Sequence, residues 1–189
     1  RFIKLKSLKF ILKMNKVFIA TSVDGFIADK NGGIDWLHNI PNPDNLDMGY
    51  NNFMKGIDAI VMGKNTFETV CGFNIDWPYA VPVFVLSNSL QNIPEKFKDK
   101  AKLVNGDLTE IIAQINASGY QNLYIDGGKT IQSFLNQNLI NEITITLIPI
   151  LLGEGIPHFS KLKNKLNLEC TKTTLFTNKI VQNQFKFKS

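Results

Sequence analysis

Two short stretches of this chain, residues 63–66 and 127–130, carry residue types suited to holding an anion. Each stretch brings glycine, lysine and threonine to a point where an apolar run gives way to a helical pattern. The first N–H groups of a helix lack partners within the helix, and the helix dipole places partial positive charge there. Glycine lets a ligand approach the backbone, lysine adds a charge, and threonine adds a hydroxyl. If both turns lie at one edge of a sheet, two helix N-termini can flank a diphosphate.

An acid stands at the second of these turns. Asp126 ends the apolar run 123–126, directly before the paired glycines. This position is the carboxyl end of a predicted strand, where open α/β sheets usually bind their ligands. Two other phosphate-binding motifs are excluded: a P-loop needs glycine in place of Leu123, and no G-x-G-x-x-G pattern follows the first predicted strand. A dinucleotide would therefore be held differently from one in a Rossmann fold.

The elements that must position these residues alternate between strands and helices until about residue 140, after which β structure takes over. This order predicts an α/β fold with a mostly parallel central sheet, helices on its faces, and a C-terminal antiparallel hairpin at one edge. Predicted helices cover residues 42–55, 64–70, 107–118 and 128–135. Predicted strands cover residues 16–22, 58–62, 80–86, 101–104, 123–126, 142–150, 166–175 and 179–188, and residues 23–38 form a long polar loop.

The net positive charge of the chain is concentrated at its start. Five of the 21 Lys and Arg residues lie in residues 1–13, which leaves 16 to balance the 16 acidic residues. The rest of the chain therefore has no basic field that would hold a nucleic acid. We expect residues 1–13 to be a disordered or helical basic extension and residues 14–189 to form a single domain.

The sequence also limits membrane, disulfide and metal functions. No apolar stretch reaches 18 residues, so we expect neither a transmembrane helix nor a membrane partner. Cys71 and Cys170 are too few for a disulfide framework and fit a reducing, cytoplasmic compartment. His38 and His158 are the only histidines, and no cluster has metal-ligand spacing, so no metal site is predicted. We expect His158 to be a surface or loop residue.

Six motifs follow one another along the chain: SVDGFIA at 22–28, DW at 35–36, DAIVMGKNTFE at 58–68, LSNS at 86–89, YIDGG at 124–128 and PILLGEGIPHF at 149–159. In this order they resemble the motifs of the dihydrofolate reductase superfamily. Within it, the chain is most similar to the reductase domain of the riboflavin-biosynthesis deaminase–reductase and to its free-standing relatives, over about residues 16–187. The resemblance implies a dihydrofolate-reductase-like three-layer sandwich.

By this resemblance the cofactor is NADPH. The family usually has arginine where this chain has Lys64, and lysine keeps the charge but loses the bidentate fork. The choice between NADPH and NADH therefore stays open. The resemblance implies that the nicotinamide pocket is lined by Ala20 and Ile27 and covered by Trp36. It implies that phosphates are held by Gly63, Lys64 and Thr66, and that the diphosphate is cradled by Gly127, Gly128, Lys129 and Thr130. The adenosine end would be flanked by Leu86, Ser87 and Asn88.

Three acids compete for a catalytic or substrate-binding role. Asp126 is the first candidate, because the riboflavin-pathway reductases carry an acid at the matching position, where the folate enzymes usually have glycine. Asp47 is the second, because it lies sixteen residues before Gly63, a spacing similar to that of the folate-binding acid in dihydrofolate reductases. The interpretation favoured for Asp47 itself is a solvated acid of the predicted helix 42–55. Asp24 precedes a glycine in a predicted turn and is expected to be structural.

The sequence supports three hypotheses of different classes. In the first, the protein is an NADPH-dependent reductase of the riboflavin-biosynthesis type that transfers hydride to a pyrimidine–ribose or similar heterocycle, with reduction of a pterin as the folate-like alternative. In the second, it binds NADPH without catalysis. In the third, residues 1–13 associate with nucleic acid or membrane. The family resemblance also implies a homodimer built from late β structure.

Overall fold

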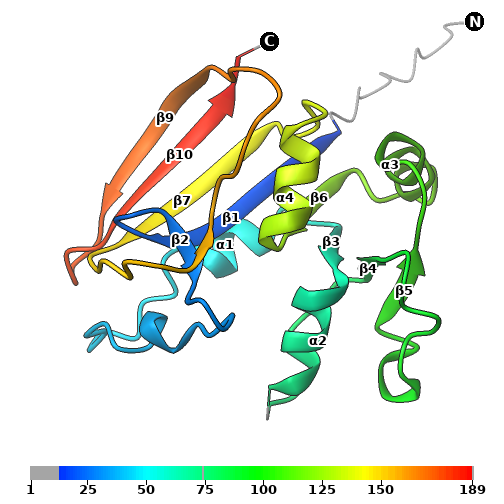
Figure 1. The fold of residues 1–189 in the computed structure, drawn as a ribbon, viewed down its shortest axis with the longest axis horizontal. Coiled ribbons are helices and arrows are strands. Elements are labelled where there is room, and N and C mark those ends of the chain that lie inside the picture. Colours follow the sequence, from blue (N-terminus) through cyan, green and yellow to red (C-terminus); the bar gives the residue numbers. More distant parts are fainter. Residues whose placement is uncertain (1–12, 74, 189) are drawn as a thin grey trace, which may run out of the picture.

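The computed structural model describes residues 13–73 and 75–188 (Figure 1). The predicted basic extension lies outside this part of the chain, except for Lys13. The centre of the fold is one eight-stranded sheet in the order β5-β4-β3-β6-β1-β7-β10-β9. Its strands are β1 (Met14–Ser22), β3 (Ala59–Gly63), β4 (Val83–Leu86), β5 (Ala101–Val104), β6 (Asn122–Asp126), β7 (Glu142–Ile148), β9 (Leu168–Leu175) and β10 (Val181–Phe187).

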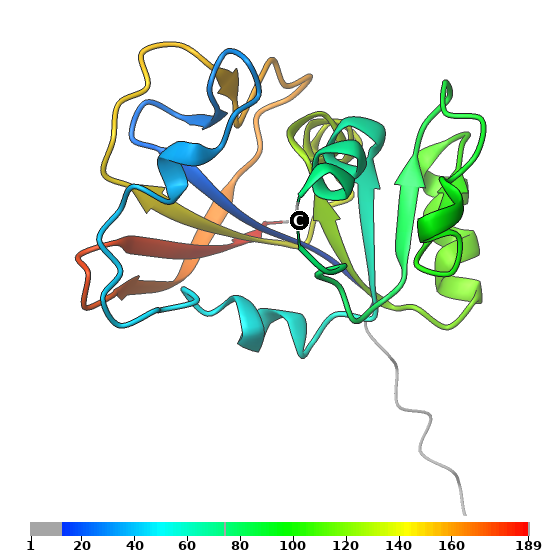
Figure 2. The same ribbon diagram turned by 90° about the horizontal axis from the view of Figure 1, so that it is seen from below.

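The sheet combines parallel and antiparallel pairing. All neighbours from β5 to β7 are parallel, whereas β10 pairs antiparallel with both β7 and β9. Figure 2 shows the β9–β10 hairpin at one end of the sheet and β5 at the other. The central strands are apolar and buried on both faces, as parallel strands covered by helices must be. The predicted mixed sheet with a C-terminal hairpin is confirmed.

Helices cover both faces of this sheet and complete a three-layer sandwich. Helices α3 (Leu108–Ala117) and α4 (Gly128–Leu135) pack on one face, and α1 (Tyr50–Met54) and α2 (Lys64–Gly72) pack on the other. Asp107 caps α3 as predicted, because its Oδ1 atom accepts hydrogen bonds from the N–H groups of Thr109 and Glu110. Two short 3-10 helices, η1 (Asp35–Leu37) and η2 (Glu95–Phe97), lie in the connections.

The helix predicted over residues 42–55 is wrong for most of its length, because α1 has only five residues. Asn45, Met48 and Gly49 all have positive φ angles, which an α-helix cannot contain. The side chains compete with helical hydrogen bonding as well: the Oδ1 atom of Asp47 accepts from Gly49 N–H and its Oδ2 atom from Asn51 N–H. The predicted strands 80–86 and 142–150 are also shortened, to β4 and β7.

A small lobe stands over the carboxyl edge of β1. Its core is the antiparallel pair β2 (Phe26–Ala28) and β8 (Ile156–Pro157). Asp24 holds the base of the lobe: its carboxylate accepts a hydrogen bond of 2.7 Å from Gly153 N–H and one of 2.6 Å from the Ser22 hydroxyl. Asp24 is therefore structural, as expected, and the predicted long loop is anchored by bonds to residues more than a hundred positions away.

Candidate active site

The two glycine-containing junctions lie side by side. Strands β3 and β6 are parallel neighbours with Met62 opposite Asp126, so both strands end at the same edge of the sheet. Helices α2 and α4 begin directly after these strand ends, one on each face of the sheet. The N–H groups of two helix starts are thereby brought to one place, which gives the edge a partial positive charge.

The junctions approach each other so closely that side chains are excluded. A Cβ atom added to Gly63 would lie 2.9 Å from the hydroxyl of Thr130, and one added to Gly127 would collide with the hydroxyl of Thr66. Gly127 also has a φ angle of 88°, which residues other than glycine rarely adopt. Backbone N–H groups of two helix starts, uncovered by side chains at the glycines and flanked by two hydroxyls, form a cradle that fits the diphosphate of a dinucleotide.

A cleft of about 1110 Å³ runs over these junctions. It is much longer than the junctions themselves, because it extends to the ends of β4 and β5 in one direction and to β1 in the other. This extent suits a dinucleotide rather than an isolated phosphate. Among the residues predicted for the site, the cleft is lined by Ala20, Ile27, Gly63, Lys64, Thr66, Leu86, Ser87, Asn88, Asp126, Gly127, Gly128, Lys129 and Thr130.

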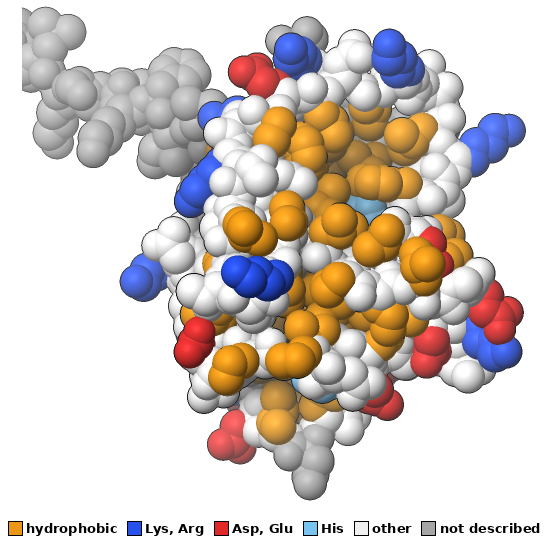
Figure 3. All heavy atoms as spheres, turned by 90° about the vertical axis from the view of Figure 1, so that its left-hand side faces the viewer, with side chains coloured by type: hydrophobic (Ala, Val, Ile, Leu, Met, Phe, Trp, Pro, Cys, Tyr) orange, Lys and Arg blue, Asp and Glu red, His pale blue; other side chains and the backbone are white. Residues whose placement is uncertain are grey.

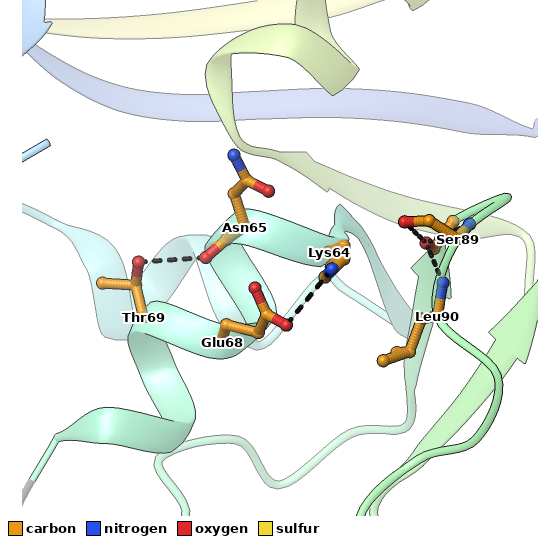
Figure 4. Close-up of polar contacts among 7 residues, drawn as sticks. Lys64, Asn65, Glu68, Thr69, Ser89 and Leu90 are labelled. Carbon is orange, nitrogen blue, oxygen red and sulfur yellow. Dashed lines mark hydrogen bonds and ion pairs between the residues drawn. The ribbon is translucent and has the colours of Figure 1, made fainter.

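The two lysines of the cradle differ in their surroundings. The Nζ atom of Lys64 lies 3.7 Å from a carboxylate oxygen of Glu68, one turn along α2 (Figure 4). Lys129 has no ion-pair partner within the described residues. Across from Lys64, Figure 4 shows Ser89 and Leu90 in the turn after β4, where their N–H groups donate hydrogen bonds to the Ser87 hydroxyl.

The end of the cleft near β1 holds an acid among aromatic side chains. The Oδ1 atom of Asp126 accepts a hydrogen bond of 2.8 Å from Gly127 N–H, which fixes the carboxyl group at the strand end. Burial raises the pKa of Asp126, so a proton is held more readily there than on an exposed carboxylate. Phe18, Tyr79 and Tyr124 line the cleft with it. No sequence pattern indicates these aromatic residues as part of the site, because they come from two strands and a loop far apart in the chain.

Trp36 is not placed in the cleft. Its side chain is 6% exposed and packs in a separate apolar cluster with Ile148 and Ile180. The residue lies in η1, so the chain around it is ordered into a helical turn. The position of Trp36 in a polar loop suggested a cover for the nicotinamide, but its burial among apolar residues gives it a packing role.

Asp47 is also outside the main cleft. It is exposed and lies at the entrance to a second cavity of about 250 Å³, beside Met48 and Leu46. Hydrogen bonds from the N–H groups of Asn51 and Gly49 lower its pKa, so it remains a carboxylate. Asp47 therefore shapes the chain before α1, and Asp126 is the acid that the main cleft contains.

The prediction for His158 is right in part: the residue lies in a loop directly after β8, but its side chain is buried and not at the surface. Its side chain is 2% exposed, and neither ring nitrogen has a hydrogen-bond partner within the described residues. The ring centroid lies 3.9 Å from that of Phe159, with the planes nearly perpendicular. Burial lowers the pKa of His158 to about 4, so the ring is neutral at physiological pH. The pairing of β8 with β2 buries this residue, and the local sequence carries no signal of that pairing.

Neither a metal site nor a membrane span is found in the described part of the chain. No group of three or more His, Cys, Asp and Glu side chains there could hold a metal ion. Within residues 13–73 and 75–188, every helix is too short or too polar to cross a lipid bilayer.

The fold and the cleft together define an α/β protein of the dihydrofolate-reductase-like class. The family model for the RibD C-terminal domain matches residues 16–182, and the chain belongs to this family. The uncharacterized protein YwjB of Bacillus subtilis is 33% identical over 161 residues, which are 82% of this chain and 89% of YwjB.

Solved structures support the same assignment. A Shewanella sp. PV-4 protein that is named for riboflavin biosynthesis superimposes with a TM-score of 0.90 at 49% identity, over 93% of this chain and 99% of that one. A deaminase/5-amino-6-(5-phosphoribosylamino)uracil reductase of Thermotoga maritima has a TM-score of 0.70 at 14% identity, over 94% of this chain and 57% of the other. Dihydrofolate reductase of Enterococcus faecalis, solved with NADP(H), has a TM-score of 0.64 at 18% identity, over 93% of this chain and 97% of the other. The last two show the fold.

Proposed function

We propose that this protein is an NADPH-dependent reductase of the riboflavin-biosynthesis type, with a pyrimidine–ribose compound or a similar heterocycle as its substrate. The observation that carries the proposal is the pair of facing glycine junctions, where a Cβ atom added to Gly63 or Gly127 would meet the threonine hydroxyl of the other junction. When bound in the cleft, NADPH would supply a hydride from its nicotinamide ring. The residues of this chain would bind it, orient it beside the substrate and exclude water.

From the position of the cradle we infer a role for each part of the cleft. The first N–H groups of α2 and α4, with Lys64 and Lys129, would hold the diphosphate. The adenosine would lie toward β4, against the Leu86–Asn88 turn that lines that end of the cleft. The nicotinamide would then lie toward β1, between Ala20 and Ile27.

Asp126 is the group that would move a proton. It lines the cleft at the β1 end, and the hydrogen bond from Gly127 N–H holds one of its two oxygens. Because burial raises its pKa, the other oxygen can hold a proton and donate it to a nitrogen or oxygen of the substrate when the adjacent carbon is reduced. The proposed role in proton donation depends on both the position of Asp126 in the cleft and its burial.

The folate-like alternative is less well supported. It depends on an acid at the position of Asp47. That carboxylate is exposed and accepts hydrogen bonds from the N–H groups of Gly49, which precedes α1, and Asn51, in its first turn.

The test is steady-state oxidation of NADPH with 5-amino-6-(5-phosphoribosylamino)uracil and, separately, with dihydrofolate. Turnover of dihydrofolate alone would replace our assignment with the folate one. Tight NADPH binding without turnover of any heterocycle would favour the non-catalytic hypothesis.

We also propose that the protein is a homodimer. Strand β9 is exposed along almost its whole length at the edge of the sheet. The cross-strand row Leu147–Val181–Leu175 presents leucines that are 37% and 64% exposed. Figure 3 shows hydrophobic side chains gathered on the side of the molecule that holds these strand ends. Light scattering should give a dimer mass that falls to the monomer mass in a Leu147→Lys/Leu175→Lys variant; a monomeric wild type would contradict the proposal.

We further infer a small-molecule role in the cytoplasm rather than one at nucleic acid or membrane. The described residues show a cleft sized for small molecules, and both cysteines are free thiols. Deletion of residues 1–13 should leave NADPH binding unchanged, and fluorescence titration of the two proteins measures this directly.

A further inference from the structure

The positive charges that line the cleft are unevenly distributed. Within the described residues, the lysines of its lining are Lys30, Lys64 and Lys129. Lys64 and Lys129 belong to the two junctions that would hold the cofactor diphosphate. Lys30 forms a 2.6 Å ion pair with Glu154, and both side chains are more than 60% exposed. Two of the three lysines would therefore bind the cofactor, and the third, Lys30, is paired with Glu154 at the rim of the lobe.

The end of the cleft beyond the nicotinamide position is aromatic and acidic. Phe18, Tyr79, Tyr124 and Asp126 line it. Tyr124 donates its hydroxyl to the carbonyl oxygen of Phe18 at 3.0 Å, which fixes both residues. The Phe18 ring packs 5.0 Å from the ring of Phe53, centroid to centroid. This wall offers flat apolar surface and a carboxyl group, and no ammonium or guanidinium group from the described chain.

The second cavity continues this end of the cleft. It shares Phe18, Ala20 and Leu37 with the main cleft and is otherwise walled by aliphatic side chains and a few neutral polar ones. Asp47 is the one charged residue in its lining within the described part of the chain. With a volume of about 250 Å³, below the usual range for drug-sized ligands, the cavity has room for a small ring rather than a second nucleotide.

From this distribution of charge and shape, we propose that the substrate is an uncharged flat heterocycle without a phosphate group, placed against Phe18 and extending into the second cavity. The inference rests on the proposed function and narrows its substrate class. A phosphate at this end would be desolvated against the aromatic wall and would lie near the Asp47 carboxylate with no cation to compensate it, which costs binding free energy. An uncharged ring buries apolar area there and can donate hydrogen bonds to the two carboxyl groups.

A matched pair of ligands tests the inference. We would titrate the NADPH-loaded protein with 5-amino-6-(5-phosphoribosylamino)uracil and with the same compound lacking its phosphate. We expect the compound without phosphate to bind at least about tenfold more tightly, which is the effect of one unfavourable charge contact. Equal or tighter binding of the phosphorylated compound overturns the inference, and so does binding of neither. Failure to bind NADPH in the preceding titration is a different result, because it removes the proposed function itself.

A charge-introducing variant provides a second, independent measurement. Tyr79→Lys places an ammonium group at the aromatic end of the cleft, and Ile75→Lys places the same charge on the same loop at a side chain that is 62% exposed and outside the cleft. We expect Tyr79→Lys to shift the affinity ratio toward the phosphorylated compound by about tenfold. Ile75→Lys should leave the ratio unchanged. If both variants or neither shift the ratio, the local absence of a cation does not set the selectivity.

Discussion

The side of the cleft proposed to bind the nucleotide and the side proposed to bind the substrate, here the nucleotide side and the substrate side, are built in different ways. The nucleotide side consists of backbone N–H groups, glycines, lysines and hydroxyls from two consecutive-residue stretches, 63–66 and 127–130. The substrate side consists of side chains from β1, β6 and the loop before β4, brought together by the order of the strands. A site made of backbone depends on glycine geometry, whereas a site made of side chains depends on packing and protonation. The two sides should therefore respond to different perturbations.

The largest expected effect is on the substrate side. Asp126→Asn keeps the size of the side chain but removes the transferable proton, so kcat should fall by about a hundredfold to a thousandfold. The Kd for NADPH should change less than about twofold, because the Oδ1 atom of asparagine can still accept the hydrogen bond from Gly127 N–H. Steady-state kinetics and fluorescence titration measure the two quantities. A large change in Kd with a normal kcat would mean that Asp126 acts in nucleotide binding, and it would contradict the distinction between the two sides.

The next effect concerns pH and the lobe above the substrate side. The pKa of His158 is about 4 in the folded protein, below the ordinary value of 6.5. Between these values the unfolded state binds more protons, so the stabilisation from the neutral ring is complete above about pH 6.5 and is lost as the pH falls toward 4. The loss should approach about 3 kcal/mol in the free energy of unfolding.

Denaturant unfolding of wild type and His158→Phe at several pH values measures this contribution. The phenyl ring fills the same buried site beside Phe159 and cannot titrate. The wild type should lose stability between pH 6.5 and pH 4 relative to the variant. If the free energy of unfolding changes with pH in the same way in both proteins, His158 has the same pKa in the folded and unfolded states.

The third prediction concerns the two glycines of the nucleotide side. Gly127→Ala must accommodate a φ angle of 88° and a collision with Thr66, and it should weaken NADPH binding by about thirtyfold, or about 2 kcal/mol. Gly63 has an ordinary φ of −80°, so Gly63→Ala meets only the Thr130 hydroxyl and should cost less. Fluorescence titration of both variants ranks them. Equal losses of NADPH affinity in the two variants would mean that steric contact with a threonine, and not the backbone conformation at Gly127, causes the weaker binding.

The smallest effect separates the two lysines. Lys129→Ala should raise the Kd for NADPH about tenfold, because a charge next to the diphosphate is removed. Lys64→Ala should raise it about threefold, since Glu68 already offsets part of the Lys64 charge. Both effects should shrink with added salt. Repeating the titrations with NADH tests the cofactor preference, and a reversed order of the two lysines would contradict this account of their surroundings.

The sequence alone determined the alternation of elements, the ends of the two strands that precede the junctions, and the glycine, lysine and threonine content of both junctions, because periodicity and turn chemistry act over neighbouring residues. It did not determine the short α1, where Asn45, Met48 and Gly49 adopt positive φ angles, nor the burial of His158 and Trp36. Those outcomes depend on which distant segments pack together. The tertiary structure decided that residues 63–66 face residues 127–130, since β3 and β6 become neighbours only when β6 enters the sheet between β3 and β1. It also decided that Asp126, and not Asp47, shares the main cleft with the cradle, because a side chain's neighbours are set by sheet order and loop path rather than by spacing along the chain.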